Sequence, residues 1–137
     1  MKTEELKKKI LGPPFTYSIL LSSLFFICGC DQFIEDIEEE EIKLLSPEQS
    51  AELNVGEVLF WWDEIEDADR YDFQLVRPSF AQVDQFVVDT TLQHVDSLHT
   101  VINRLELTLS PGIYEWRVRG RNFGYETNFQ SRSFRIN

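Results

Sequence analysis

The segment Leu109–Arg121, LSPGIYEWRVRGR, carries the clearest fold signal in this chain. Its Ser-Pro-Gly sequence at 110–112 predicts a tight turn, because proline fixes φ and glycine accepts positive φ. After the turn, large apolar side chains alternate with charged ones, which is the period of a β-strand that buries one face. The expected inward row is Tyr114, Trp116 and Val118, and the expected outward row is Glu115, Arg117, Arg119 and Arg121.

The same alternation recurs on the N-terminal and C-terminal sides of this segment and predicts an all-β domain. Further short strands are expected at 42–45, 85–89 and 131–136, whereas residues 98–102 fit either a strand or a helical turn. About seven short strands at this spacing indicate an immunoglobulin-like sandwich of two antiparallel sheets. The other expected inward rows are Val58, Phe60 and Trp62; Tyr71, Phe73 and Leu75; Phe86 and Val88; Leu105, Leu107 and Leu109; and Phe134 and Ile136.

Three motifs in this order resemble a fibronectin type III domain: VLFWW at 58–62, ADRY at 68–71 and LSPGIYEWRV at 109–118. The resemblance covers residues 42–137 and is to the single-domain version found in Gram-negative outer-membrane lipoproteins. It implies that Trp62 is a core residue and that Tyr114 forms the tyrosine corner of the family. It also implies a binding or spacing module, although a fold does not by itself fix a function.

The N-terminal residues predict export from the cytoplasm. A lysine-rich start is followed by an apolar run of 13 residues, 15–27, which is shorter than the roughly 20 residues of a spanning helix and typical of a secretory signal. Residues 27–30, Ile-Cys-Gly-Cys, resemble the lipobox of bacterial lipoproteins. That resemblance implies cleavage before Cys30 and lipidation of its thiol, so that residues 1–29 are a signal peptide. The alternative is an ordinary secreted protein that is cut nearby.

Composition limits the possible partners. Removing residues 1–29 deletes four lysines and two glutamates, so the net charge falls from −11 to −13. A surface this negative disfavours nucleic acid and anionic lipid as partners of the domain. The mature chain keeps only Cys30, so no disulfide is expected. Residues 31–41, DQFIEDIEEEE, predict an acidic solvated tether from 30 to 41, ahead of one domain at 42–137. They also resemble, loosely, the signals that move some lipoproteins to the outer face of the outer membrane.

Candidate binding residues lie in the last loop. Aromatic side chains there offer faces for sugar rings or for protein partners, or they cover the end of the sandwich. Trp61 is a second candidate on an outward face, unless the Arg117 stem or the tether covers it. The three outward arginines 117, 119 and 121 predict cross-strand pairs with Asp72 and Glu115, or else a site for an anionic glycan or an acidic partner. The candidate ligand-binding residues are Trp61, Asn122, Phe123, Tyr125 and Phe129.

No motif in the sequence predicts catalysis, a metal site or a cofactor. The acidic loop 63–69 lacks the spacing of a calcium loop, and His94 and His99 have no further placed ligand for zinc. The expected function is therefore a non-catalytic, lipid-anchored binding or accessory module of the cell envelope, in a glycan-handling assembly or with an envelope protein partner. The expected location is the outer membrane, on its outer face rather than in the periplasm. The alternatives are a structural spacer or adhesion component, and a small hydrolase.

Overall fold

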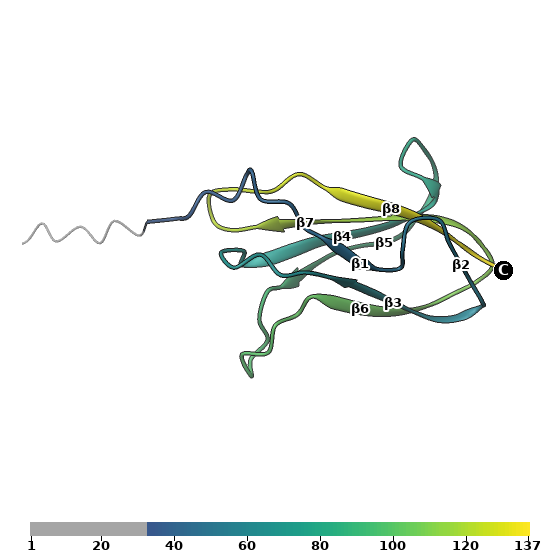
Figure 1. The fold of residues 1–137 in the computed structure, drawn as a ribbon, viewed down its shortest axis with the longest axis horizontal. Helices are drawn as coiled ribbons and strands as arrows, with labels where there is room; N and C mark the ends of the chain where they lie inside the picture. Colours follow the sequence, from purple (N-terminus) through teal and green to yellow (C-terminus); the bar gives the residue numbers. More distant parts are fainter. Residues whose placement is uncertain (1–32) are drawn as a thin grey trace, which may run out of the picture. The chain divides into compact units, whose positions relative to one another are not determined.

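The computed structural model describes residues 33–137, so the predicted signal peptide 1–29 and Cys30 lie outside the described residues. The described part forms eight β-strands (Figure 1). It contains no helix that is long and apolar enough to cross a membrane. The strands are β1 (Leu44–Ser46), β2 (Ala51–Leu53), β3 (Gly56–Trp62), β4 (Arg70–Ser79), β5 (Gln82–Gln93), β6 (Arg104–Leu109), β7 (Gly112–Arg121) and β8 (Gln130–Ile136).

The strands form two sheets that face each other, which confirms the predicted all-β sandwich. One sheet has the order β1-β3-β6, and the other has the order β2-β8-β7-β4-β5. Neighbouring strands are antiparallel except for β2, which runs parallel to β8. The sequence did not predict β2, because a three-residue strand is too short to show an alternating pattern. It adds the eighth strand and makes one sheet mixed.

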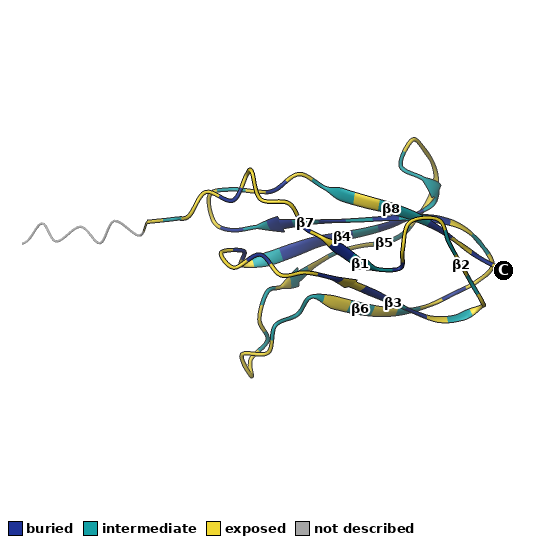
Figure 2. Ribbon diagram, viewed as in Figure 1, coloured by how far each residue is buried: buried dark blue, intermediate teal, exposed yellow. Residues whose placement is uncertain are grey.

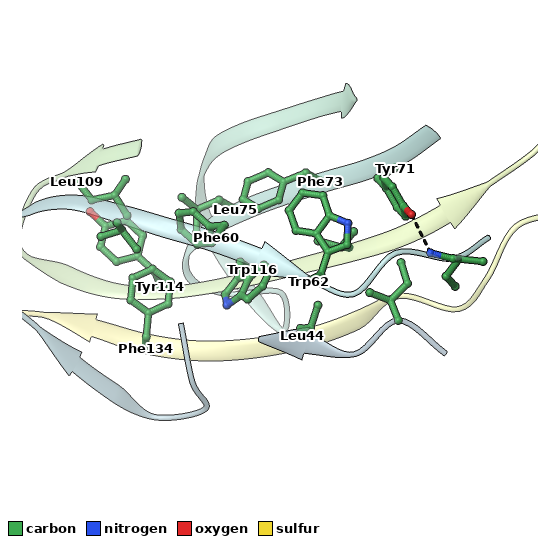
Figure 3. Close-up of a cluster of buried hydrophobic side chains, with 14 of the residues drawn as sticks. Leu44, Phe60, Trp62, Tyr71, Phe73, Leu75, Leu109, Tyr114, Trp116 and Phe134 are labelled. Carbon is green, nitrogen blue, oxygen red and sulfur yellow. Dashed lines mark hydrogen bonds between the residues drawn. The ribbon is translucent and has the colours of Figure 1, made fainter. Parts of the chain in front are cut away.

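Aromatic rings fill the space between the sheets (Figures 2 and 3). Phe60 is fully buried and packs edge-to-face on three rings of the opposite sheet, with centroid distances of 5.1 Å to Phe73, 5.2 Å to Trp116 and 5.7 Å to Phe134. Each such pair contributes roughly 0.5–1.5 kcal/mol beyond the burial of its area. The predicted inward rows of β3, β4, β7 and β8 are confirmed, including Trp62 as a core residue.

The prediction that Phe86 faces the core is wrong. Val88 pairs with Leu75 and packs against the core, but Phe86 pairs with the next residue of β4, Val76, and is 52% exposed. The register shift leaves Val87 as an extra residue in β5. One extra residue reverses the parity of the alternation, so Phe86 lies on the outer face of the sheet. The strand itself is also longer than the predicted segment 85–89.

Residues 94–103 form neither the strand nor the helical turn that the sequence allowed. They make a loop closed by one isolated bridge between Val95 and Val101. The Asp96 carboxylate accepts hydrogen bonds from the backbone N–H groups of Leu98 and Thr100, at 2.8 and 2.9 Å. A side chain that bonds the backbone locally in this way favours a turn over regular structure.

Residues 34–41 differ from the solvated tether that their charge predicted. Ile37 is only 1% exposed and belongs to the core, and the Glu35 carbonyl accepts a hydrogen bond of 2.7 Å from the Asn122 side chain. Ile37 is buried and Ile34 is partly buried, while the carboxylates of this acidic segment are exposed to water. The packed unit therefore begins at Ile34, eight residues before the predicted boundary.

The tyrosine corner is present. The Tyr114 hydroxyl donates a hydrogen bond of 2.7 Å to the Ser110 carbonyl, four residues earlier. The ring is buried and stacks on Phe134 with a centroid distance of 5.4 Å. The bond therefore links the turn before β7 to the core.

We expect Tyr114→Phe to lower the free energy of unfolding by about 1–2 kcal/mol, because it removes the donor and leaves the Ser110 carbonyl without this partner. Urea denaturation followed by tryptophan fluorescence measures the change. Tyr125→Phe is the control, because its hydroxyl makes no hydrogen bond within residues 33–137, and a change below about 0.5 kcal/mol is expected. Equal effects of the two substitutions would contradict a special role of the corner.

Candidate functional site

Asn122, a predicted ligand residue, is buried and holds the end of the sandwich together. Its side-chain oxygen accepts hydrogen bonds from the N–H groups of Gly124 and Tyr125, at 3.0 and 2.8 Å. Its side-chain nitrogen donates to the carbonyls of Glu35 and Asp67, at 2.7 and 3.3 Å. The amide has both donors and its acceptor engaged within the protein, so this residue positions the last loop and the N-terminal segment.

The three aromatic residues of the last loop have different surroundings. Phe123 is 85% exposed at the tip of the turn. Tyr125 is half-buried and packs against the core. Phe129 lies beneath two guanidinium groups, those of Arg117 at 4.2 Å and Arg119 at 4.6 Å from the ring centroid. Only Phe123 therefore presents a largely free aromatic ring.

Trp61 is 44% exposed on the outer face of the three-stranded sheet, where it pairs with Arg104 of β6. Arg117 belongs to the other sheet, so the alternative that its stem covers Trp61 is wrong. Because the last loop joins β7 and β8 of the five-stranded sheet, the structure does not bring Trp61 into one site with the loop residues.

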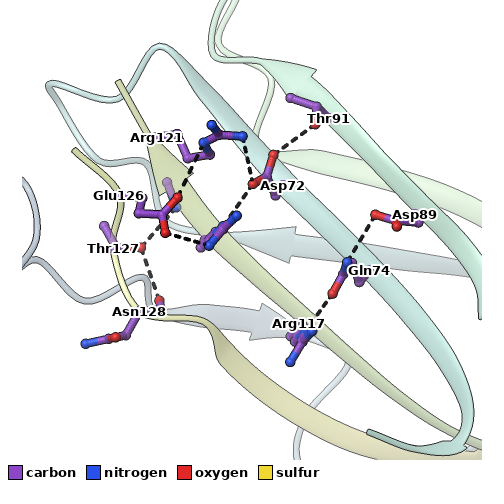
Figure 4. A network of polar contacts seen from close by, with 11 residues as sticks. Asp72, Gln74, Asp89, Thr91, Arg117, Arg121, Glu126, Thr127 and Asn128 are labelled. Atoms are coloured by element: carbon purple, nitrogen blue, oxygen red, sulfur yellow. Dashed lines mark hydrogen bonds and ion pairs between the residues drawn. The ribbon is translucent and has the colours of Figure 1, made fainter. Parts of the chain in front are cut away.

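The outward arginines of β7 form a network with acidic groups, which we call the arginine face: Arg117, Arg119 and Arg121 (Figure 4). Arg119 contacts Asp72 at 2.8 Å and Glu126 at 2.9 Å. Arg121 contacts the same two carboxylates at 3.4 and 3.7 Å. The predicted pairing with Asp72 is therefore present, and two of the three positive charges are matched inside the protein.

Glu115 does not take the predicted part in this network. It accepts a hydrogen bond of 2.7 Å from the Phe80 backbone N–H instead. Arg117 donates to the Gln74 side chain at 2.8 Å, and its guanidinium lies 3.9 Å from the centroid of the Phe80 ring. Phe80, Arg117, Phe129 and Arg119 thus form a continuous series of cation–π contacts, each worth roughly 0.5–1 kcal/mol at an exposed site.

The Asp72 carboxyl is the electrostatic centre of the arginine face. Burial opposes its ionisation, but the hydrogen bonds from Arg119 and Thr91 and the charges of Arg121 and Arg119 outweigh that effect, so the pKa of Asp72 lies below its ordinary value. The Thr91 hydroxyl donates at 2.9 Å from β5 and the arginines approach from β7. The carboxylate therefore links three adjacent strands.

An open hollow adjoins the arginine face beside the N-terminal segment and has a volume of about 440 Å³. Its wall combines carboxylates and a side-chain amide with one aromatic ring, so it suits a hydroxyl-rich ligand better than an apolar one. Sequence reasoning identified Phe129 but missed most of the wall, because nothing in the sequence showed that residues 38–39 pack here. The lining residues are Glu38, Glu39, Arg119, Glu126, Thr127, Asn128 and Phe129.

The acidic loop 63–69 is tied to His94. The His94 ring contacts the Tyr71 hydroxyl at 3.0 Å through Nδ1 and the Glu64 carboxylate at 3.7 Å through Nε2. Burial raises the pKa of Tyr71; the Glu64 carboxylate adds to this effect and the hydrogen bond from the Ile65 N–H opposes it. Within residues 33–137, no three histidine, cysteine or carboxylate side chains are grouped so as to hold a metal ion.

We expect Asp72→Asn to lower the free energy of unfolding by about 1–3 kcal/mol near neutral pH, because hydrogen bonds to a charged group are lost. The folded-state pKa lies below the ordinary value of 3.8. The stabilisation is therefore complete above about pH 4–5 and is lost as the pH falls through the folded-state pKa. Urea denaturation at several pH values measures the difference between the two proteins.

Asp84→Asn is the control, because it removes one negative charge from the same strand pair at a residue that makes no ion pair within the described part of the chain. A difference for Asp72→Asn that stays constant from pH 7 to pH 2, or one that matches Asp84→Asn, would contradict the proposed role of the ionised carboxylate.

No protein-family model matches this sequence, and no curated protein matches it. Among solved structures, the chain is similar to the crystal structure of FN3tt, with 20% identity and a TM-score of 0.45, over 72% of this chain and 90% of that chain. It is also similar to the structure of an FN3tt mutant, with 22% identity and a TM-score of 0.40, over 61% of this chain and 91% of that chain.

Proposed function

We propose that the mature protein is a non-catalytic, lipid-anchored binding module of the cell envelope, located in the outer membrane with its domain on the outer face. The lipobox-like residues 27–30 support the anchor, and the acidic residues that follow support surface exposure. The packing of residues 34–41 adds a physical constraint. Only residues 31–33 separate the packed unit from Cys30, so its first residue would be held within about 14 Å of the anchor.

The observation that carries a binding role is the hollow beside Phe129. Sugar hydroxyls both donate and accept hydrogen bonds, and the wall offers both functions through the side-chain amide of Asn128 and the nearby carboxylates. The ring of Phe129 supplies an apolar edge. A neutral glycan fits this chemistry better than an anionic one, because Arg119 already pairs with Asp72 and Glu126.

A protein partner is the second candidate, supported by the free edge of β5. This 12-residue strand has no neighbour on its outer side among the described strands. Exposed backbone groups of an edge strand pair readily with another chain. Val83 and Phe86 are exposed along the same strand and provide apolar contact area. This edge would serve a spacer or adhesion component held by protein contacts.

The anchor is tested by lipid labelling. We expect the protein to incorporate labelled palmitate in a lipoprotein-processing bacterium and to fractionate with the outer membrane, whereas Cys30→Ala should do neither. Mass spectrometry of the mature chain should show an acylated N-terminal Cys30. An unmodified N-terminus at another residue would overturn the proposed anchor. Protease treatment of intact cells then distinguishes the outer face from the periplasm.

Glycan binding is tested with the purified protein on a glycan array, followed by calorimetry. We expect Asn128→Ala to weaken binding at least about tenfold, which corresponds to a loss of about 1.4 kcal/mol. Gln85→Ala is the matched control, an exposed amide on β5 away from the hollow, and should bind normally. Absence of any glycan ligand, together with a partner pulled from envelope extract and lost in Phe86→Lys, would favour the protein-partner alternative.

A further inference from the structure

Two loop tips at one end of the sandwich expose large apolar side chains. Phe123 is 85% exposed and Leu98 is 81% exposed, and they are the two most exposed large apolar residues of the unit that begins at Ile34. They belong to different loops, 122–129 and 94–103, which follow β7 and β5. Single exposed apolar residues are common on protein surfaces, so exposure alone does not indicate a function for Phe123 and Leu98. What indicates a function is instead their position at the same end of the domain, together with the hydrogen bonds that hold their loops.

Each tip is held by an Asx side chain. The Asn122 side-chain oxygen accepts hydrogen bonds from the backbone N–H groups of Gly124 and Tyr125, and these bonds fix the turn that carries Phe123. In the other loop, the Asp96 carboxylate accepts hydrogen bonds from the backbone N–H groups of Leu98 and Thr100. Such local bonds define the turn conformation. Both apolar side chains are therefore presented on ordered turns.

Both tips lie at the end of the sandwich where the chain joins it, opposite the C-terminus (Figure 1). Backbone hydrogen bonds connect the loops at this end, from the Asp69 N–H to the Arg121 carbonyl and from the His94 N–H to the Asp69 carbonyl, both at 2.7 Å. The Ile34 side chain lies next to Gly124, since a Cβ on that glycine would be 3.5 Å from it. The first residue of the packed unit thus touches the turn that carries Phe123.

We propose that this end of the domain docks on the surface of a zwitterionic bilayer, with Phe123 and Leu98 inserted at the headgroup level. The inference rests on the proposed lipidation of Cys30, which lies four residues before Ile34 and so at most about 14 Å away. An anchor this short brings the Phe123 turn to the membrane surface. Apolar side chains at this depth bind by burying area in the boundary between headgroups and acyl chains.

The charge at this end selects the type of bilayer. Glu64, Glu66 and Asp67 are exposed in the neighbouring loop 63–69 and repel anionic headgroups. A zwitterionic headgroup places an ammonium group outermost, which these carboxylates can approach. Lysines and arginines, which would favour an anionic bilayer, are absent from residues 63–69, 94–103 and 122–129.

The test uses the lipidated full-length protein, produced in a lipoprotein-processing bacterium and reconstituted in phosphatidylcholine vesicles. Ser97→Cys introduces a single free thiol beside Leu98, because the only other cysteine of the mature chain would carry lipid. An environment-sensitive fluorophore on this thiol reports contact with the bilayer through quenching by doxyl-labelled phosphatidylcholine. The same label at Val55→Cys, in the turn at the opposite end, is the positional control.

We expect quenching at residue 97 to exceed quenching at residue 55 at least threefold. Adding Leu98→Ser and Phe123→Ser to the labelled protein should abolish most of this difference. Adding Ile113→Ser, which removes an exposed apolar side chain near the other end, should leave it unchanged. Replacing a third of the phosphatidylcholine by phosphatidylglycerol should reduce it.

Flotation of the same vesicles separates the two proposals. Protein that floats with the vesicles but shows equal quenching at residues 97 and 55 overturns the docked orientation and leaves the lipid anchor intact. Quenching at residue 97 that is insensitive to the Leu98→Ser and Phe123→Ser pair also overturns the role of these side chains. Protein that does not float overturns the anchor and, with it, the docking that depends on it.

Discussion

The packing of Phe60 between the two sheets determines how the core is arranged. One ring from β3 meets rings from β4, β7 and β8, so a single side chain sets how the sheets lie against each other. A slip of one residue in any of these strands would turn its inward row outward. With Trp116 fixed inside, its neighbours Arg117 and Glu115 must lie outside, and the arginine face follows from the core.

The arginine face shows how an acidic protein uses its few cations. Arg119 and Arg121 share the carboxylates of Asp72 and Glu126, and Arg117 lies against the rings of Phe80 and Phe129. The contacts of these arginines with Asp72 hold β7 to β4, and their contacts with Glu126 and Phe129 hold the last loop against the sheet. The polar hollow next to them therefore owes its shape to this network, while its hydrogen-bonding capacity comes from Asn128 and the nearby glutamates.

Much of the fold could be predicted because a strand with one buried face shows its period in the sequence, as the rows of β3, β4 and β7 do. The prediction failed where that period is broken or absent. Val87 reverses the parity of β5 and exposes Phe86, and residues 94–103 take their shape from the Asp96 carboxylate. The candidate site was predicted less well. The burial of Asn122 depends on its contact with Glu35, and the hollow is lined in part by Glu38. Nothing in the sequence of this acidic segment indicates that it packs against the domain.

The packing of residues 34–41 changes what a lipid anchor at Cys30 would mean. As a free tether, residues 31–41 would let the domain move up to about 40 Å from the bilayer, in any orientation. With Ile37 buried in the core, the chain left between Cys30 and the sandwich is so short that a lipid on Cys30 would keep one end of the sandwich near the membrane. The C-terminus and the turn at Val55 would then point away from it, and the β5 edge would lie along the side. A partner in the surrounding medium would therefore meet the sides or the far end of the domain, and Phe123, which sequence alone favoured for ligand binding, would face the bilayer instead.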